Sequence, residues 1–209
     1  SLKKQPRWDI MVRAMVAATG QGPERPAMKF LGTGGHQRMT EDIARLFLGM
    51  DLECARCHDH PSVKTWEQAD YWGLYTYLSW TKTATNTSNK KEYLVEVLGK
   101  NEIEYQSVFA SVGDTTGPRL PGMKETVIPA LAKGQEFAKP AENGLPPVPK
   151  FLPRQQLARD LTSPKNLVFA RNSVNRFWAR LLGRGLVHPL DQSHADNPPS
   201  HPKLLEVLA

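Results

Sequence analysis

The chain has 209 residues, of which 40% are hydrophobic and 23% are charged, and its formal net charge at pH 7 is +6. This balance is typical of a folded globular protein and argues against a disordered chain. No apolar run approaches the roughly 20 residues that a helix needs to cross a bilayer, so we expect no membrane span in this chain. The basic excess permits an acidic partner without naming one.

The first part of the chain is predicted to be helical. Apolar residues recur at helical spacing over 7–19, and a Gly- and Pro-rich loop follows over 21–36. A second apolar stripe over 40–50 leads to the cysteines of the chain. A third helix is predicted over 66–79, where a capping box at 65–68 precedes apolar residues spaced i, i+3, i+4 and i+7.

The middle of the chain is predicted to hold little regular structure. The polar stretch 81–91 is expected to be irregular, and alternation over 93–97 and 103–107, around a Gly-Lys-Asn turn, predicts a β-hairpin. The segment 110–150 is rich in proline and is expected to be a connector. Helical spacing then returns over 155–161, 166–182 and 202–209. The sequence therefore predicts a mainly α fold with a small β-hairpin insertion and a second helical segment.

The most specific motif of the chain is its cysteine pair. Cys54 and Cys57, the only cysteines present, are spaced C-x-x-C and are followed at once by His58. This run is typical of haem c attachment, because each thiol can form a thioether with a vinyl group at one edge of a porphyrin. The adjacent imidazole can then ligate the iron from the proximal side. The sequence therefore predicts a covalent haem c anchored by Cys54 and Cys57, with His58 as the proximal iron ligand.

Two other interpretations of the cysteine pair stay open. A structural zinc site needs four N or S ligands, and the second pair here would have to be His58 with His60, or the distant His36. A disulfide across two residues is possible but strained. A thioredoxin-like dithiol is disfavoured, because nothing around residue 54 resembles an apolar strand that feeds a helix.

The motif does not specify the second axial ligand of such an iron. The candidates by residue type are His36, Met39, Met50 and Met123. His36 is favoured because it follows two glycines in a loop that could fold over the ring. His60 lies only two residues from His58 and is poorly placed to reach the opposite face, so it is a weaker alternative. The choice matters because methionine raises the iron potential, a second histidine lowers it, and an open position permits ligand chemistry.

The segment 150–184 is strongly basic, with Asp160 as its only acid. Arg171 and Arg176 share a face of the helix predicted there, and their guanidinium forks could pair with haem propionates. They could equally tie two parts of the protein together by buried hydrogen bonds. We interpret the basic segment as a solvated face or a docking surface for an acidic redox partner, and we expect no nucleic-acid partner.

Several motifs together resemble a known pair of domains. The first group is FLGMDLECARCHDHP at 47–61, Trp66 and DYWGL at 70–74, which resembles the end of the planctomycete cytochrome domain DUF1549 (PSCyt2). The second group, which resembles the start of its partner domain DUF1553 (PSD1), is SPKN at 163–166, FARNSVNRFW at 169–178, GRGLVHP at 183–189 and NPPSHP at 197–202. The resemblance covers about half of the chain.

The resemblance implies haem c and a periplasmic or secreted protein, but it supplies no reaction and no catalytic residues. We expect a helical c-type haem domain over 1–84, a β-hairpin and Pro-rich connector over 85–150, and the helical start of a DUF1553-like domain over 151–209. Because the chain opens at Ser1 rather than at methionine, we also expect it to be a piece of a longer parent chain.

The expected function is that of a monohaem c-type cytochrome module for extracytoplasmic electron transfer. Its expected partners are a redox protein, for which the basic net charge permits an acidic surface, and the rest of the parent chain or complex. Two other functions stay open. One is a haem-dependent oxidoreductase that acts on a small molecule or sugar derivative at an open iron site, and the other is a structural or binding module whose haem is incidental.

Overall fold

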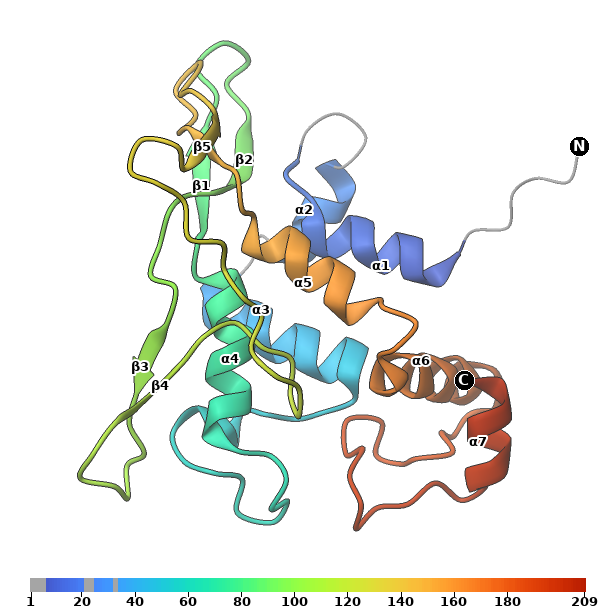
Figure 1. Ribbon diagram of the computed structural model, residues 1–209. Coiled ribbons are helices and arrows are strands. Elements are labelled where there is room, and N and C mark those ends of the chain that lie inside the picture. Colours follow the sequence, from blue (N-terminus) through green and yellow to red (C-terminus); the bar gives the residue numbers. More distant parts are fainter. Residues whose placement is uncertain (1–6, 21–24, 32–33) are drawn as a thin grey trace, which may run out of the picture.

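The computed structural model describes residues 7–20, 25–31 and 34–209. In Figure 1 the strands extend along the left edge of the molecule and the helices fill its centre and right side. The α-helices of the described residues are α1 (Trp8–Ala17), α2 (Arg25–Leu31), α3 (Gly35–Ile43), α4 (Gln68–Leu78), α5 (Pro153–Leu161), α6 (Leu167–Leu182) and α7 (Pro202–Leu208). The strands are β1 (Thr81–Thr85), β2 (Glu92–Glu96), β3 (Ile103–Tyr105), β4 (Asp114–Thr116), β5 (Phe137–Lys139) and β6 (Val148–Pro149). None of these helices is long and apolar enough to cross a membrane.

The fold is mixed α/β, with 38% helix and 13% strand, so the expectation of a mainly α fold is wrong. The strands form three separate antiparallel pairs, in the order β1–β2, β3–β4 and β5–β6. Four of them lie in stretches that were expected to be irregular or a connector. Strands β4, β5 and β6 have two or three residues, which is too short to show an alternating pattern. Strand β1 has a single buried residue, so its sequence carries little apolar signal.

The predicted hairpin between 93–97 and 103–107 does not form. Strand β2 pairs instead with β1, in a register that sets Thr83 opposite Leu94, and β3 pairs with β4. The Gly-Lys-Asn segment therefore does not connect a hairpin, and the indole N–H of Trp80 donates to the main-chain oxygen of Lys100 at 2.9 Å. A Cβ at Gly99 would lie 2.5 Å from the Trp80 ring, so this segment is packed against the indole.

Two local predictions in the first part of the chain also need correction. The described residues of the predicted loop 21–36 include helix α2, while 21–24 and 32–33 lie outside them. The capping box is not at 65–68. It forms two residues later, where the main-chain N–H of Glu67 donates to Asp70 Oδ2 at 3.2 Å and the Glu67 side chain caps the third residue of the helix. Helix α4 therefore begins at Gln68.

The helices predicted toward the C-terminus are confirmed. Helix α6 begins at an N-cap, Asn166, whose side-chain oxygen accepts from the main-chain N–H of Phe169 at 3.2 Å. It ends at Gly183, whose φ of +85° is the left-handed conformation that terminates many helices. The loop after it is held to α6 by Asn175, which both donates to and accepts from the main chain of Val187 at 2.9 Å.

One hydrophobic core joins the two ends of the chain. Its fully buried members include Val12 of α1, Ile43 of α3, Leu74 of α4 and Leu157 of α5. Arg154, at the start of α5, is completely buried and donates to the carbonyl oxygens of Val16 at 3.2 Å, Leu94 at 3.3 Å and Ala18. Helix α5 thus packs along α1, its Arg154 side chain reaches β2, and α4 lies at the centre of the packing (Figure 1).

Candidate functional site

The cysteine motif lies on a short 3-10 turn, Cys54–Arg56, in front of α4. The main-chain N–H of Cys57 donates to the oxygen of Cys54 at 3.2 Å, which closes the turn. Ala55 between them is fully buried, whereas Cys54 is exposed, Cys57 is half-buried, and both are free thiols. The turn is therefore anchored in the core by its middle residue and presents its sulfur atoms toward the surface.

The imidazole of His58 is oriented by its own neighbour. Its Nδ1 lies 2.7 Å from the main-chain oxygen of Asp59. Because a carbonyl oxygen can only accept, Nδ1 must carry the proton, and in the neutral ring Nε2 then keeps a free lone pair. A hydrogen bond from one ring nitrogen to a carbonyl is the arrangement that orients a histidine which ligates a metal through the other nitrogen.

The first turn of α4 clamps the motif from one side. The main-chain oxygen of Arg56 accepts from the indole of Trp72 and from the Gln68 side chain, each at 3.1 Å. The carboxylate of Asp59 accepts from the Gln68 main-chain N–H at 2.8 Å, where a negative charge also suits the helix N-terminus. The cysteine turn and His58 are thus mounted on α4 by three hydrogen bonds.

His60 has a structural role in the same region. Its Nδ1 accepts from the main-chain N–H groups of Ser62 at 3.2 Å and Val63 at 3.0 Å, so that nitrogen is already occupied. Its ring meets Trp66 edge-on, with centroids 5.1 Å apart. Burial lowers the pKa of the His60 imidazole, which keeps the ring neutral near pH 7.

The structure does not bring His36 or Met39 to the motif. His36 lies in the first turn of α3, and its Nε2 is 2.7 Å from the main-chain oxygen of Thr81. Its ring packs edge-on against Tyr75, which lies three residues after Trp72 on α4. Met39 is buried in the main core. Both side chains thus stabilise the packing of α3 on α4.

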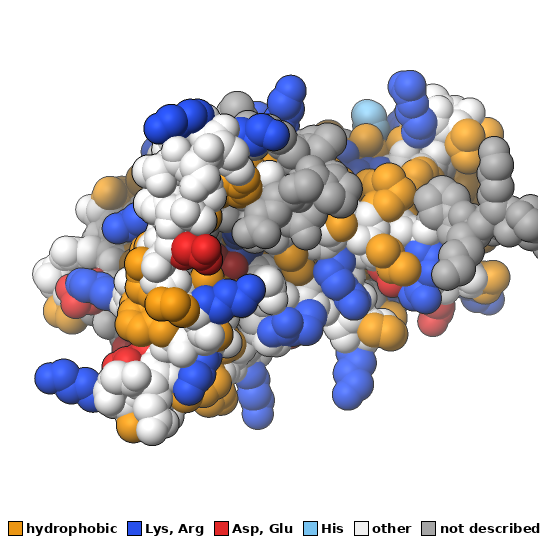
Figure 2. All heavy atoms as spheres, turned by 90° about the horizontal axis from the view of Figure 1, so that it is seen from above, with side chains coloured by type: hydrophobic (Ala, Val, Ile, Leu, Met, Phe, Trp, Pro, Cys, Tyr) orange, Lys and Arg blue, Asp and Glu red, His pale blue; other side chains and the backbone are white. Residues whose placement is uncertain are grey.

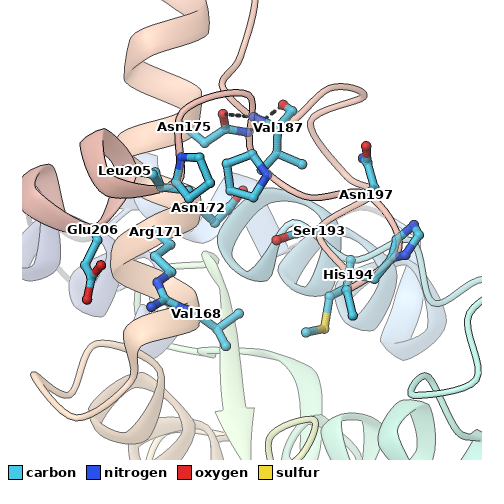
Figure 3. A pocket seen from close by; sticks show the side chains of 14 residues that line it. Val168, Arg171, Asn172, Asn175, Val187, Ser193, His194, Asn197, Leu205 and Glu206 are labelled. Carbon is cyan, nitrogen blue, oxygen red and sulfur yellow. Dashed lines mark hydrogen bonds between the residues drawn. The ribbon is translucent and has the colours of Figure 1, made fainter.

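Arg171 and Arg176 also lie away from the motif, on α6. Arg176 donates to the main-chain oxygen of Arg45, and burial lowers the pKa of its guanidinium. Arg171 is exposed beside a cavity of about 410 Å³ between α6, α7 and the loop that follows residue 187. In Figure 3, Arg171 and Glu206 lie on one side of this cavity and His194 lies on the other.

The contacts of α6 nevertheless reach the motif indirectly. The end of α3 continues as a π-helix, Ala44–Leu48, whose carbonyl groups at Arg45 and Leu46 accept from α6, the second from Asn172 at 2.8 Å. Such π-helical turns free carbonyls that need outside donors. Gly49 ends the turn with φ +69°, and a Cβ there would lie 2.6 Å from Asn172 Oδ1, so only glycine allows α6 this close.

An ion-pair network fixes the residues between the π-helix and Cys54. Arg45 pairs with Asp51 at 3.0 Å and with Asp191 at 3.4 Å, and the hydrogen bond that its guanidinium donates to Asp51 is the main cause that raises the pKa of this guanidinium. The main-chain N–H of Asp51 donates to the oxygen of Asp191 at 2.9 Å. The loop after α6, which contains Asp191, therefore holds in place the extended residues that lead to the cysteine turn.

Sequence reasoning missed the residues that hold the motif. Gln68 was predicted as part of a capping box and Trp72 as part of the DYWGL motif, but their bonds to Arg56 were not predicted, because these bonds depend on how the helix docks. Phe109, whose ring centroid is 5.2 Å from that of His58, lies between the predicted strand at 103–107 and the predicted connector at 110–150. Neither spacing nor composition carries a signal for such contacts, because they join residues that are far apart in the chain.

The interpretation of the cysteine pair as a structural zinc site gains no support from the described residues. Over residues 7–20, 25–31 and 34–209 there is no group of three or more His, Cys, Asp or Glu side chains that could hold a metal ion. A structural zinc site would need two more ligands beside the cysteines.

The geometry thus defines a mixed α/β protein with a C-x-x-C-H turn mounted on its central helix. Residues 2–83 match the family model PSCyt2, described as a protein of unknown function (DUF1549), and residues 153–209 match PSD1, described as a protein of unknown function (DUF1553). The chain thus contains a PSCyt2-like region followed by a PSD1-like region. No curated protein and no solved structure matches it.

Proposed function

We propose that this chain binds haem c covalently through Cys54 and Cys57, with His58 as the proximal iron ligand. The observation that carries the proposal is the hydrogen bond of His58 Nδ1 to the oxygen of Asp59, which leaves Nε2 as the ligand atom. The two free thiols beside it lie toward the surface, where a porphyrin edge can approach them.

The donor set fits haem c rather than a bare metal. Two thiols on one turn match the two vinyl groups on one edge of the porphyrin, and the single imidazole that follows matches one axial position of the iron. A haem iron held there supplies reversible one-electron exchange. The hydrogen bonds of Trp72 and Gln68 to Arg56 keep the turn in one conformation, which is what two simultaneous thioether bonds require.

We propose extracytoplasmic electron transfer as the role, with an acidic redox protein as partner. The basic side chains support this: Arg159, Lys165, Arg171, Arg180 and Arg184 are all exposed. Figure 2 shows Lys and Arg side chains spread over the face seen from above, with few acidic ones among them. Such a field steers an oppositely charged partner toward the protein and makes association sensitive to salt.

The test is haem staining after denaturing electrophoresis, combined with intact mass, on protein made in a host that attaches haem c. We expect a stained band and a mass increase of one haem, because only a covalent porphyrin survives denaturation. The Cys54→Ser and Cys57→Ser double variant is expected to lose both signals. An unstained wild-type band of unmodified mass, from a host that loads a control cytochrome c, contradicts the proposal.

The positions of His36 and Met39 favour a second candidate function, a haem-dependent oxidoreductase. Because His36 is bonded to Thr81 and Met39 is in the core, neither side chain is placed to ligate an iron held by His58. An axial position available to an outside ligand permits catalysis. Carbon monoxide distinguishes the two roles: a low-spin spectrum that carbon monoxide does not change favours electron transfer, and a spectrum that shifts on its addition favours catalysis.

A further inference from the structure

A loop beside the cysteine turn exposes three large apolar side chains. We call residues 106–112 the apolar loop. Within it Val108 is 66%, Phe109 is 83% and Val112 is 79% exposed. Single apolar residues at a protein surface are ordinary, but a contiguous group of large ones marks a surface that something covers.

The apolar loop is a closed turn with internal hydrogen bonds. The main-chain N–H of Ala110 donates to the oxygen of Ser107 at 3.1 Å, and that of Phe109 donates to Ser107 Oγ at 3.2 Å. The Gln106 side chain donates to the oxygen of Ala110 at 2.9 Å. These bonds hold the loop in one conformation, in which its apolar side chains are exposed.

The same loop is bonded directly to the cysteine motif. The main-chain N–H of Val108 donates to the oxygen of Cys57 at 2.9 Å. The Gln68 side chain donates both to the oxygen of Gln106, at 3.2 Å, and to that of Arg56, at 3.1 Å, so one amide holds the loop and the turn together. The position of the loop relative to the two thiols is therefore fixed.

The contact between Phe109 and His58 shows on which side of a porphyrin the apolar loop would lie. The two ring centroids are 5.2 Å apart, with 46° between the ring planes, and His58 Nδ1 is the nitrogen bonded to Asp59. A metal on Nε2 would lie in the imidazole plane, so a side chain beside that imidazole is on the proximal side of any porphyrin it ligates. We propose that the apolar loop is the proximal wall of the haem site, with Phe109, Val108 and Val112 as its porphyrin contacts.

This inference rests on the proposed function, since its occupant is the haem bound at Cys54 and Cys57. The porphyrin is favoured over a partner protein because the loop is bonded to the motif itself and Phe109 already packs on the proposed iron ligand. Covering the three side chains with an apolar macrocycle removes them from water without moving the main chain.

The test is limited chymotrypsin digestion of the haem-loaded chain and of the haem-free Cys54→Ser and Cys57→Ser double variant, with fragments identified by mass. Chymotrypsin cleaves after aromatic residues, and Phe109 is in an exposed loop. Phe137 is the internal control, because it is 39% exposed on β5 and lies outside the motif. We expect haem to slow cleavage after Phe109 by about tenfold relative to cleavage after Phe137, since a covered site must open before it is cut.

A second readout uses the Phe109→Ala variant, with Phe137→Ala as its control, both loaded with haem. Removing the proximal wall admits water to the porphyrin, so we expect Phe109→Ala to shift the midpoint potential and the Soret band and Phe137→Ala to leave both unchanged. The proximal wall is contradicted, and the haem site is not, by the following result. The chain stains for haem, the ratio of cleavage after Phe109 to cleavage after Phe137 is the same with and without haem, and the midpoint potential of Phe109→Ala equals that of the wild type. A chain that takes up no haem overturns the proposed function itself.

Discussion

The indole N–H of Trp72 donates a hydrogen bond of 3.1 Å to the main-chain oxygen of Arg56. This bond ties the central helix to the middle of the C-x-x-C turn. We expect the Trp72→Phe variant to lose about 1 kcal/mol in the free energy of unfolding, the usual worth of one such bond. We also expect a smaller fraction of the chain to carry haem, because the turn is then less well held.

Trp80→Phe is the matched control for this prediction. Trp80 makes an equivalent bond to the main-chain oxygen of Lys100, at 2.9 Å, in the β region. Urea denaturation and haem-to-protein absorbance ratios measure the two effects. If both variants lose stability and both load haem as fully as the wild type, Trp72 does not hold the turn for haem attachment.

The close approach of α6 to Gly49 leads to a second prediction. Gly49→Ala places a side chain at φ +69° and sets its Cβ 2.6 Å from Asn172 Oδ1. The left-handed backbone alone costs about 1–2 kcal/mol for a residue with a Cβ. We expect a larger loss here, because α6 must also move away from the π-helix.

Gly122→Ala separates these two contributions. Gly122 has φ +70°, and a Cβ there would meet nothing within 4 Å, so only the backbone cost applies. Thermal and urea unfolding of both variants give the difference. Equal losses would show that the contact with Asn172 adds nothing.

The ion pair between Arg45 and Asp51 leads to a third prediction. Asp51→Asn removes the 3.0 Å pair that fixes the residues before Cys54, and we expect a loss of about 1 kcal/mol, at the upper end for partly exposed pairs. Asp42→Asn breaks a pair of the same length, Arg38 with Asp42, on the outside of α3, and should cost less than about 0.5 kcal/mol. Similar values for the two variants in urea denaturation contradict a special role for Asp51.

Glu96 gives a prediction for pH. Burial raises the pKa of its carboxyl group, which Arg154 only partly opposes, while its Oε1 accepts from the main-chain N–H of Arg154 at 2.6 Å. A carboxyl whose folded pKa exceeds its unfolded value, about 4.3, stabilises the fold in acid, and this contribution is lost as pH rises through the folded pKa.

Glu96→Gln keeps an oxygen acceptor for Arg154 but does not titrate. We expect the variant to gain stability relative to the wild type as pH rises from about 4 toward neutrality. Urea denaturation of both proteins over this range measures the difference. A variant that instead becomes relatively less stable toward pH 7 would mean that the ionised Glu96 is held by the buried Arg154.

Local patterns explain what could be predicted. Helix α6 has a long apolar stripe, an Asn cap before it and a glycine after it, and each of these signals is read within a few residues. The C-x-x-C-H run is likewise local, so its chemistry can be inferred without any fold. The strands could not be predicted in the same way, because pairs such as β3 with β4 are short and depend on a partner supplied by another part of the chain.

The sequence by itself determined which side chains could anchor a haem, because thioether and iron-ligand chemistry depends on residue types at fixed spacing. The tertiary structure alone decided their surroundings. It placed His36 near Thr81, bonded Trp72 and Gln68 to the cysteine turn, and set Phe109 against His58. These contacts join residues up to 51 positions apart (Phe109 and His58), and they depend on how distant parts of the chain pack together rather than on any local pattern.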